Sequence, residues 1–130
     1  MIDIIQKKYQ GDPWKVVICC IMLNQTTNTQ VRPVVERFFE RFPNPKRAAE
    51  SQETEISNML TGTGLQNQKA KRILNFSRSW VSGERDRDKL PGVGPYAKEA
   101  LRIFVDGDLN FVPNDKKLRI YVSESLSSTF

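Results

Sequence analysis

The chain has 130 residues, which suffice for one compact domain and not for two of ordinary size, and its 38% hydrophobic and 27% charged residues argue against a disordered protein. It contains no histidine and only two cysteines, the adjacent Cys19 and Cys20, so histidine catalysis, histidine-ligated zinc and a four-thiolate iron–sulfur cluster are excluded. The formal net charge is +5, no apolar run approaches the ~18 residues of a membrane span, and no signal-peptide pattern follows Met1, so an intracellular protein is expected.

The first part of the chain has the pattern of consecutive helices. Residues 2–9 predict a short apolar–polar helix, and a second helix starts at Pro13 with Asp12 as its N-cap. From Trp14 to Leu23 nearly every residue is apolar, which predicts a helix buried on most sides. A third helix carries an apolar stripe that Pro43 and Pro45 end, formed by Val31, Val34, Val35, Phe38, Phe39 and Phe42.

The second part continues this pattern. A short apolar helix around residues 56–60 precedes a glycine-rich turn, and a longer helix covers about residues 67–82. A tight turn at residues 90–94 leads into a helix over about 95–105, and a last helix begins around Asp115. Because no segment shows sustained alternation of apolar and polar residues, the predicted fold class is all-α.

The basic excess lies in one part of the chain. Residues 69–102 hold 9 basic and 4 acidic side chains, a surplus of +5, and the remaining segments nearly balance. Within it, the turn Leu90-Pro91-Gly92-Val93-Gly94 lets the backbone approach a ligand, and the next helix points free N–H groups at the turn. These features favour the sugar–phosphate backbone of nucleic acid as partner. An ordinary helix–turn–helix corner with a solvated basic face is the alternative.

The motifs around this turn resemble a known family. The turn continues as Pro95-Tyr96-Ala97, and Asp115 follows 19 residues after Tyr96. Together with Asp12-Pro13-Trp14-Lys15 and Leu23-Asn24-Gln25-Thr26, this pattern is similar to the helix-hairpin-helix (HhH-GPD) base-excision DNA glycosylases. Within that superfamily, the thymine glycosylase domain of methyl-CpG-binding-domain proteins is the branch that the chain resembles most.

The resemblance covers about residues 5–122 and implies a single domain over residues 1–130. Two helical lobes would enclose a DNA-binding cleft, one made by the N- and C-terminal helices and the other by about residues 22–107. The hairpin at residues 90–95 would grip double-stranded DNA that carries a mismatched or damaged base. Members of the family usually work as monomers. The expected location is the compartment that holds the DNA, which is the cytoplasm of a prokaryote or of a phage-infected host, or the nucleus.

The resemblance assigns the chemistry to Asp115 and Tyr96. Breaking an N-glycosidic bond builds positive charge on the sugar, and an ionised carboxylate stabilises that charge, orients water or attacks the anomeric carbon. Asp115 is also a predicted N-cap, a compatible role because a helix N-terminus keeps a carboxylate ionised. Relatives that also cut the strand carry lysine where this chain has Tyr96, and a phenol forms no imine. A monofunctional glycosylase that leaves an abasic site is therefore expected, with a merely packing tyrosine as the alternative.

Further residues match positions that contact DNA in the family. Gln6 matches a glutamine whose amide pairs with the edge of a pyrimidine in the base pocket. Tyr96 is expected to line the same pocket. Leu65 matches an apolar wedge that fills the gap left by a flipped base. A solvated Gln6 and a buried Leu65 are the alternatives. Gln25 stands where the most similar branch carries arginine, so recognition of an opposite guanine is not implied. The predicted DNA contacts are Asn24, Gln25, Thr26, Gly64, Leu65, Pro91, Gly92, Val93, Gly94, Lys98 and Lys117.

No cofactor is expected, because the iron–sulfur loop of the family is absent. The backbone carbonyls of Asp88, Leu90 and Val93 match a family site for a structural Na⁺ or K⁺. The predicted function is excision of thymine or uracil opposite guanine, or of an oxidised or modified pyrimidine, by base flipping and hydrolysis. Two alternatives stay open: a relative that uses the same aspartate on a modified base or nucleotide, and a non-catalytic hairpin module that binds DNA.

Overall fold

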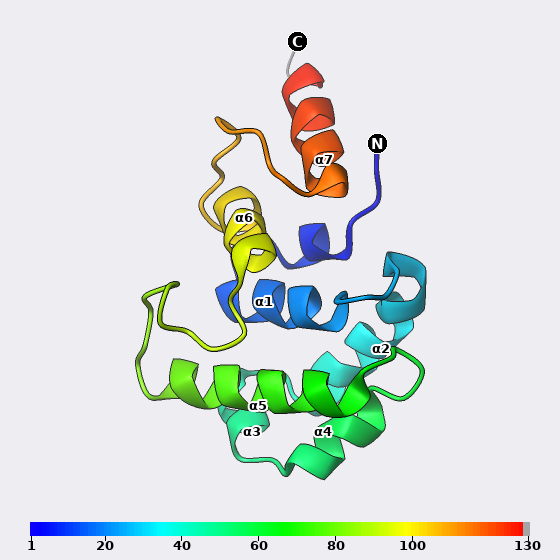
Figure 1. The fold of residues 1–130 in the computed structure, drawn as a ribbon, viewed down its shortest axis with the longest axis vertical. Coiled ribbons are helices and arrows are strands. Elements are labelled where there is room, and N and C mark those ends of the chain that lie inside the picture. Colours follow the sequence, from blue (N-terminus) through cyan, green and yellow to red (C-terminus); the bar gives the residue numbers. More distant parts are fainter. Residues whose placement is uncertain (129–130) are drawn as a thin grey trace.

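The computed structural model describes residues 1–128, which form one 3₁₀ helix and seven α-helices without a strand (Figure 1). This confirms the all-α prediction. None of these helices combines the length and the apolar content that crossing a membrane requires. In chain order the elements are η1 (Ile5–Tyr9), α1 (Pro13–Met22), α2 (Asn28–Arg41), α3 (Pro45–Ala49), α4 (Glu53–Met59), α5 (Gln66–Val81), α6 (Pro95–Phe104) and α7 (Lys116–Ser127).

The clearest differences from the sequence predictions concern three elements. The first helix is a 3₁₀ turn that begins at Ile5, after an extended Ile4. The helix α2 begins at Asn28, before its apolar stripe, because Thr27 and Gln30 form a capping box there. The helix α3 was not predicted at all. Pro45 is its first residue and Asn44 caps it by accepting a hydrogen bond from the backbone N–H of Arg47 at 3.0 Å, so a proline that ends one pattern also begins the next helix.

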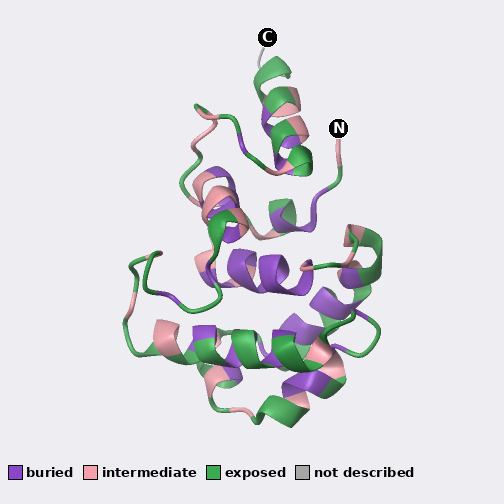
Figure 2. Cartoon of the chain, viewed as in Figure 1, coloured by how far each residue is buried: buried purple, intermediate pink, exposed green. Residues whose placement is uncertain are grey.

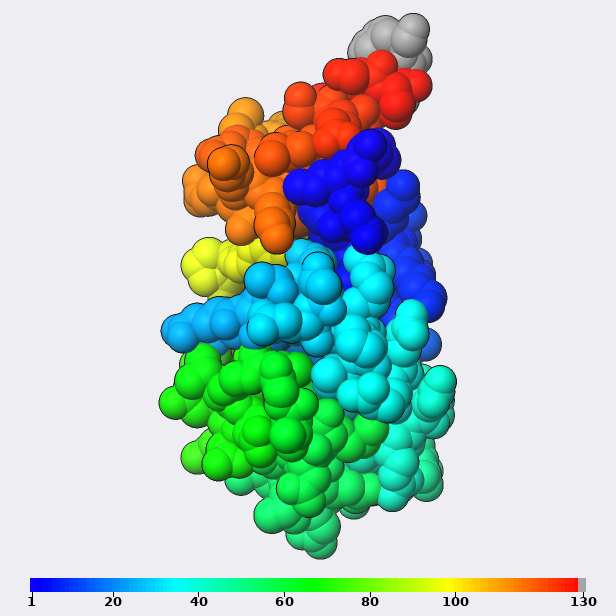
Figure 3. Space-filling view, turned by 90° about the vertical axis from the view of Figure 1, so that its right-hand side faces the viewer, coloured from blue at the N-terminus to red at the C-terminus, as the bar shows by residue number. Residues whose placement is uncertain are grey.

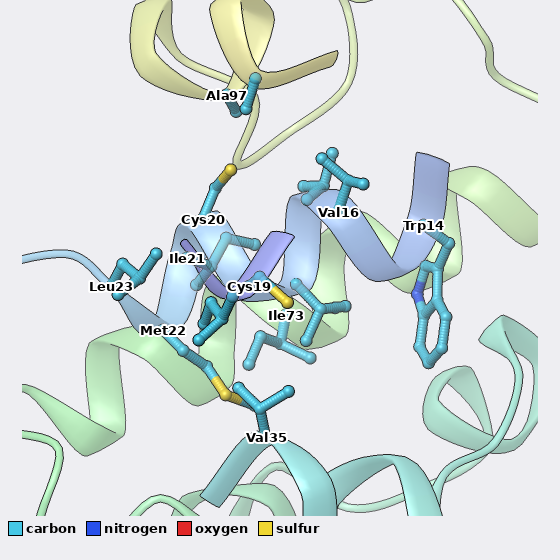
Figure 4. Packing of buried hydrophobic residues seen from close by; sticks show 14 of the residues in the cluster. Trp14, Val16, Cys19, Cys20, Ile21, Met22, Leu23, Val35, Ile73 and Ala97 are labelled. Carbon is cyan, nitrogen blue, oxygen red and sulfur yellow. The ribbon is translucent and has the colours of Figure 1, made fainter. Parts of the chain in front are cut away.

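The helix α1 lies at the centre of the molecule and is covered on opposite sides (Figure 1). Figure 2 shows it almost entirely buried, as its apolar sequence predicts. Figure 4 shows how its side chains divide: Cys20 points toward Ala97 in α6, whereas Met22 points toward Val35 in α2. The helix α5 packs beside α1 and is itself covered by α3 and α4, and α6 contacts η1 and α7. The limits of the two lobes stay a prediction.

A buried hydrogen bond ties α1 to α5 inside an aromatic cluster. The indole N–H of Trp14 donates to the hydroxyl of Ser77 at 3.0 Å, and both residues are buried. The Trp14 ring also contacts Phe38 and Phe39 of α2, with ring centroids 6.4 and 5.6 Å away. Since a buried indole N–H needs an acceptor, Ser77 is the polar residue that lets Trp14 occupy this core.

Substitution Ser77→Ala should therefore lower the free energy of unfolding by about 1–3 kcal/mol, because it leaves the buried N–H of Trp14 without an acceptor. Urea unfolding followed by tryptophan fluorescence measures the change. Ser79→Ala is the control on the same helix, where no side-chain hydrogen bond is lost, and should change stability by about 0.5 kcal/mol or less. Equal stabilities of the two variants would contradict the assignment.

Candidate functional site

A cavity of about 790 Å³ opens where the end of α1, the hairpin and the start of α7 meet. Its wall comes from the last turn of α1 and the loop that follows, from the first turns of α6 and α7, and from Arg72 in α5. Figure 3 views the molecule from the side on which the light-blue segment after α1 lies between the green segment below and the yellow and orange segments above. The predicted site residues that line this cavity are Asn24, Gln25, Thr26, Gly92, Gly94, Tyr96, Asp115 and Lys117.

The half-buried Asp115 caps α7 at the cavity wall. Its Oδ2 accepts a hydrogen bond from the backbone N–H of Leu118 at 2.9 Å, which confirms the predicted N-cap. The helix N-terminus places partial positive charge beside this carboxylate. The capping bond occupies one of its oxygens, and Oδ1 has no partner within residues 1–128.

A second carboxylate, Glu99, supports the backbone at Asp115. Its Oε2 accepts from the backbone N–H of Asn114 at 2.6 Å and its Oε1 from that of Asp115 at 3.3 Å. Glu99 lines the cavity as well, and sequence reasoning missed it. The available signal was its position three residues after Tyr96, which puts both side chains on one face of α6.

Gln6, Tyr96 and Cys20 form a hydrogen-bonded group at the cavity wall. The amide nitrogen of Gln6 donates to the Tyr96 hydroxyl at 2.8 Å and to the Cys20 sulfur at 3.5 Å. Gln6 itself does not line the cavity: it is fully buried behind Tyr96 and Cys20, and its Oε1 has no partner within residues 1–128. Burial raises the pKa of Tyr96 above its ordinary value and that of Cys20 to about 12. The phenol and the thiol therefore stay protonated at neutral pH.

Two non-glycine residues among those described have a left-handed backbone, Gln25 at φ 55° and Leu65 at φ 51°. This conformation costs an ordinary residue about 1–2 kcal/mol, so the surrounding structure has to hold it. Gln25 is exposed at the cavity mouth. Leu65 is 37% exposed and lies on the neighbouring loop, outside the cavity wall. Both belong to the segments that the sequence predicted to enter DNA.

The hairpin depends on Gly92, which has φ 84°. A Cβ added there would lie 3.2 Å from the end of the Ile21 side chain, so any larger residue would be both strained and crowded. Of the predicted cationic contacts, Lys98 pairs with Asp88, and its hydrogen bond lowers the pKa of that carboxyl. Lys117 and Arg72 are exposed and have no ion pair within residues 1–128. Sequence reasoning missed Arg72. The signal that could have identified it as a DNA contact was its position in the basic part of the chain.

The remaining predicted residues lie beside the cavity rather than on its wall. Gly64 belongs to the exposed loop of Leu65, and Pro91 and Val93 to the hairpin. Within residues 1–128, no three Cys, Asp or Glu side chains are placed to hold a metal ion together. At the predicted cation site, the Leu90 carbonyl accepts from the N–H of Val93 at 3.3 Å and keeps a second lone pair. The Na⁺ or K⁺ site at the carbonyls of Asp88, Leu90 and Val93 stays a prediction.

Comparison with known proteins places this geometry in a family. Residues 18–121 match the model of the HhH-GPD superfamily base excision DNA repair proteins. A methyl-CpG-binding domain protein 4-like protein of Arabidopsis thaliana is 35% identical over 121 residues, which are 92% of this chain and 27% of that protein. A thymine-DNA glycosylase of Aeropyrum pernix is 33% identical over 100 residues, 70% of this chain and 45% of that protein.

Solved structures agree with the sequence comparison. A thermostable thymine-DNA glycosylase superimposes with a TM-score of 0.73 at 25% identity, covering 82% of this chain and 52% of the other. An endonuclease III trapped on DNA shares the fold with a TM-score of 0.71 at 23% identity, and the alignment covers 89% of this chain and 66% of the other. The chain spans between about a quarter and a half of the length of the curated relatives described above. Since the family model matches 104 of its 130 residues, the chain belongs to the HhH-GPD superfamily of base excision DNA repair proteins.

Proposed function

We propose that the chain is a monofunctional DNA glycosylase that removes thymine, uracil or a modified pyrimidine opposite guanine and leaves an abasic site. The observation that carries this proposal is the placement of Asp115 at the wall of a cavity of about 790 Å³. Such a volume lies within the ~300–1,000 Å³ of ordinary small-molecule sites and suits a flipped nucleotide. The name of the Aeropyrum pernix relative, thymine-DNA glycosylase, supports the choice of base, as does that of a thymine/uracil-DNA glycosylase of Pyrobaculum aerophilum that is 35% identical over 105 residues.

Asp115 supplies the negative charge that the reaction requires. As the bond between base and sugar breaks, positive charge develops on the sugar, and a fixed carboxylate stabilises it. The capping bond from Leu118 holds Oδ2, so Oδ1 is the oxygen that faces the sugar or orients the attacking water. Glu99 acts through Asp115 as a positioning residue, because its two oxygens hold consecutive backbone N–H groups at Asn114 and Asp115.

Tyr96 supports the monofunctional assignment. Its phenol is held by Gln6 and stays protonated, and it offers no amine for an imine with the sugar. Lys116 and Lys117 also line the cavity, so a chemical test of imine formation has to accompany the activity assay. Tyr96 would form the side of the base pocket, and Gln6, buried behind it, would hold its hydroxyl and keep Oε1 as an acceptor beside the pocket.

Double-stranded DNA is the proposed partner of the surface around the cavity, and the protein acts as a monomer where cellular DNA is. The hairpin and the free cations Arg72 and Lys117 would contact phosphates, while Gln25 and Leu65 would enter the duplex beside the flipped base. A Na⁺ or K⁺ held by the carbonyls of the hairpin would add positive charge at a phosphate. No other cofactor is proposed.

Substitution Asp115→Asn tests the chemistry without removing the helix cap, since an asparagine oxygen still accepts from Leu118. End-labelled duplexes with one G·T, G·U or G·5-hydroxymethyluracil pair are incubated and split into samples with and without alkali. We expect the wild type to give breaks only after alkali, and the variant to be slower by about 10²–10³-fold because the stabilising charge is gone.

Three other results would contradict parts of the proposal. Strand breaks before alkali, or a borohydride-trapped adduct, would show imine chemistry and overturn the monofunctional assignment. If only duplexes with other modified pyrimidines were cleaved, the result would favour the alternative in which the same aspartate acts on a different, modified base. Tight duplex binding without cleavage, unchanged in Asp115→Asn, would favour the non-catalytic binding module.

Glu99→Ala tests the positioning role. We expect the single-turnover excision rate to fall by about 10–100-fold, since small displacements of a catalytic group have effects of that size, while duplex affinity stays within a factor of about three. Glu99→Gln keeps one acceptor oxygen, so its excision rate should fall less than that of Glu99→Ala. Glu53→Ala removes an acidic side chain that has no described side-chain partner and should behave as wild type. A parallel loss of rate and affinity in Glu99→Ala would instead indicate general destabilisation.

A further inference from the structure

Lys69 is a buried cation that the proposed chemistry does not use. It lies in the first turns of α5, its side chain is 0% exposed, and burial lowers its pKa below the ordinary value. Full burial of a lysine is rare unless its ammonium group has a structural partner. No carboxylate pairs with it within residues 1–128.

The partner of Lys69 is the backbone of the loop before α5. Its ammonium group donates to the carbonyl of the buried Thr63 at 2.8 Å. Its backbone N–H donates to the carbonyl of Leu65 at 2.9 Å, which is the first i→i−4 bond of α5. The side-chain bond to Thr63 is therefore the contact that requires a lysine at this position. Together these bonds anchor the segment in which Leu65 has its left-handed backbone.

The same Thr63 carbonyl also accepts a hydrogen bond from the other loop. Its second donor is the hydroxyl of Thr26, which follows the left-handed Gln25 at the cavity mouth. Thr26 and Thr63 are 37 residues apart in the sequence, and their segments lie against each other in Figure 3, light blue on green. Both lone pairs of one buried carbonyl are thus used, one by each loop.

We propose that Lys69, Thr63 and Thr26 form a latch that makes the loops of residues 24–26 and 61–65 one mechanical unit, so that Gln25 and Leu65 enter the duplex together. Insertion of the two residues rests on the proposed function; the latch itself rests on the contacts above. Left-handed backbone at Gln25 and Leu65 persists only where neighbouring contacts hold it, and the latch supplies those contacts. Lys69 is accordingly a positioning residue for both insertion loops.

The first test uses the free protein and does not depend on glycosylase activity. Lys69→Met keeps the length and apolar packing of the side chain and removes its donor, and Thr26→Val removes the hydroxyl at similar size. Each should speed amide hydrogen exchange at least tenfold in both loops, whereas Thr26→Ser should retain protection. Lys71→Met is the matched control, an exposed cation two residues further along α5 with no partner within residues 1–128. Faster exchange confined to the altered loop would overturn the latch.

The second test asks whether the loops act together on DNA. Affinity for a duplex with a tetrahydrofuran abasic analogue opposite guanine is measured for Gln25→Ala, Leu65→Ala and the double variant. When Lys69 is present, the double variant should bind only slightly more weakly than the single variant with the larger loss of affinity. When Lys69→Met is added to all three variants, the fold-loss of the double variant should equal the product of the two single fold-losses. Multiplying losses with Lys69 present would overturn the proposal. Because no base is excised in this assay, it stays interpretable if the excision chemistry fails, and the exchange test on the free protein does not depend on DNA at all.

Discussion

The apolar surface of α1 has to be covered on every side, and the arrangement of the other helices follows from that requirement. Helices α2 and α5 cover one side, while η1 and α6 cover the other. Burial of apolar area is the largest favourable contribution to folding, so a helix with eight buried residues out of ten determines what packs around it. The cavity lies where this cover ends. Cys20, Ile21 and Leu23 belong at once to the hydrophobic core and to the cavity wall.

The electrostatics of the cavity combine two helix N-termini with two carboxylates. Both α6 and α7 begin at the cavity, where their unpaired N–H groups carry partial positive charge. At α7 this charge is balanced by Asp115, with Glu99 bonded to the preceding backbone. At α6 no side-chain cap is present, so the N–H groups behind the hairpin stay available for an anion. The cavity therefore combines unpaired N–H groups that suit an anion with a fixed carboxylate at its wall.

Several buried polar residues hold the cavity wall or the loops beside it in place. Among residues 1–128, the buried polar or charged residues are Gln6, Ser57, Thr63, Lys69 and Ser77. Gln6 holds Tyr96 from behind, Lys69 and Thr63 join the two strained loops, and Ser77 accepts from Trp14. A buried polar group is costly unless its bonds are made, so each of these contacts selects one arrangement of its partners. The unpaired Oε1 of Gln6 is the exception, and it belongs to the residue behind the cavity wall.

The sequence by itself determined what depends on neighbours along the chain. Asp12 and Pro13 start α1, Gly92 shapes the hairpin and Asp115 caps α7, because caps and turns are formed by residues a few positions apart. The family motifs, read from the same local spacings, placed Asp115 and Tyr96 at one site. Only the tertiary structure decided the contacts between distant segments: Gln6 with Tyr96 across 90 residues, Glu99 with the backbone of Asp115, and the joint hold of Thr26 and Lys69 on Thr63. These bonds leave no periodic pattern in the sequence, since a single side chain meets a backbone group or a distant side chain whose position is set by packing around α1.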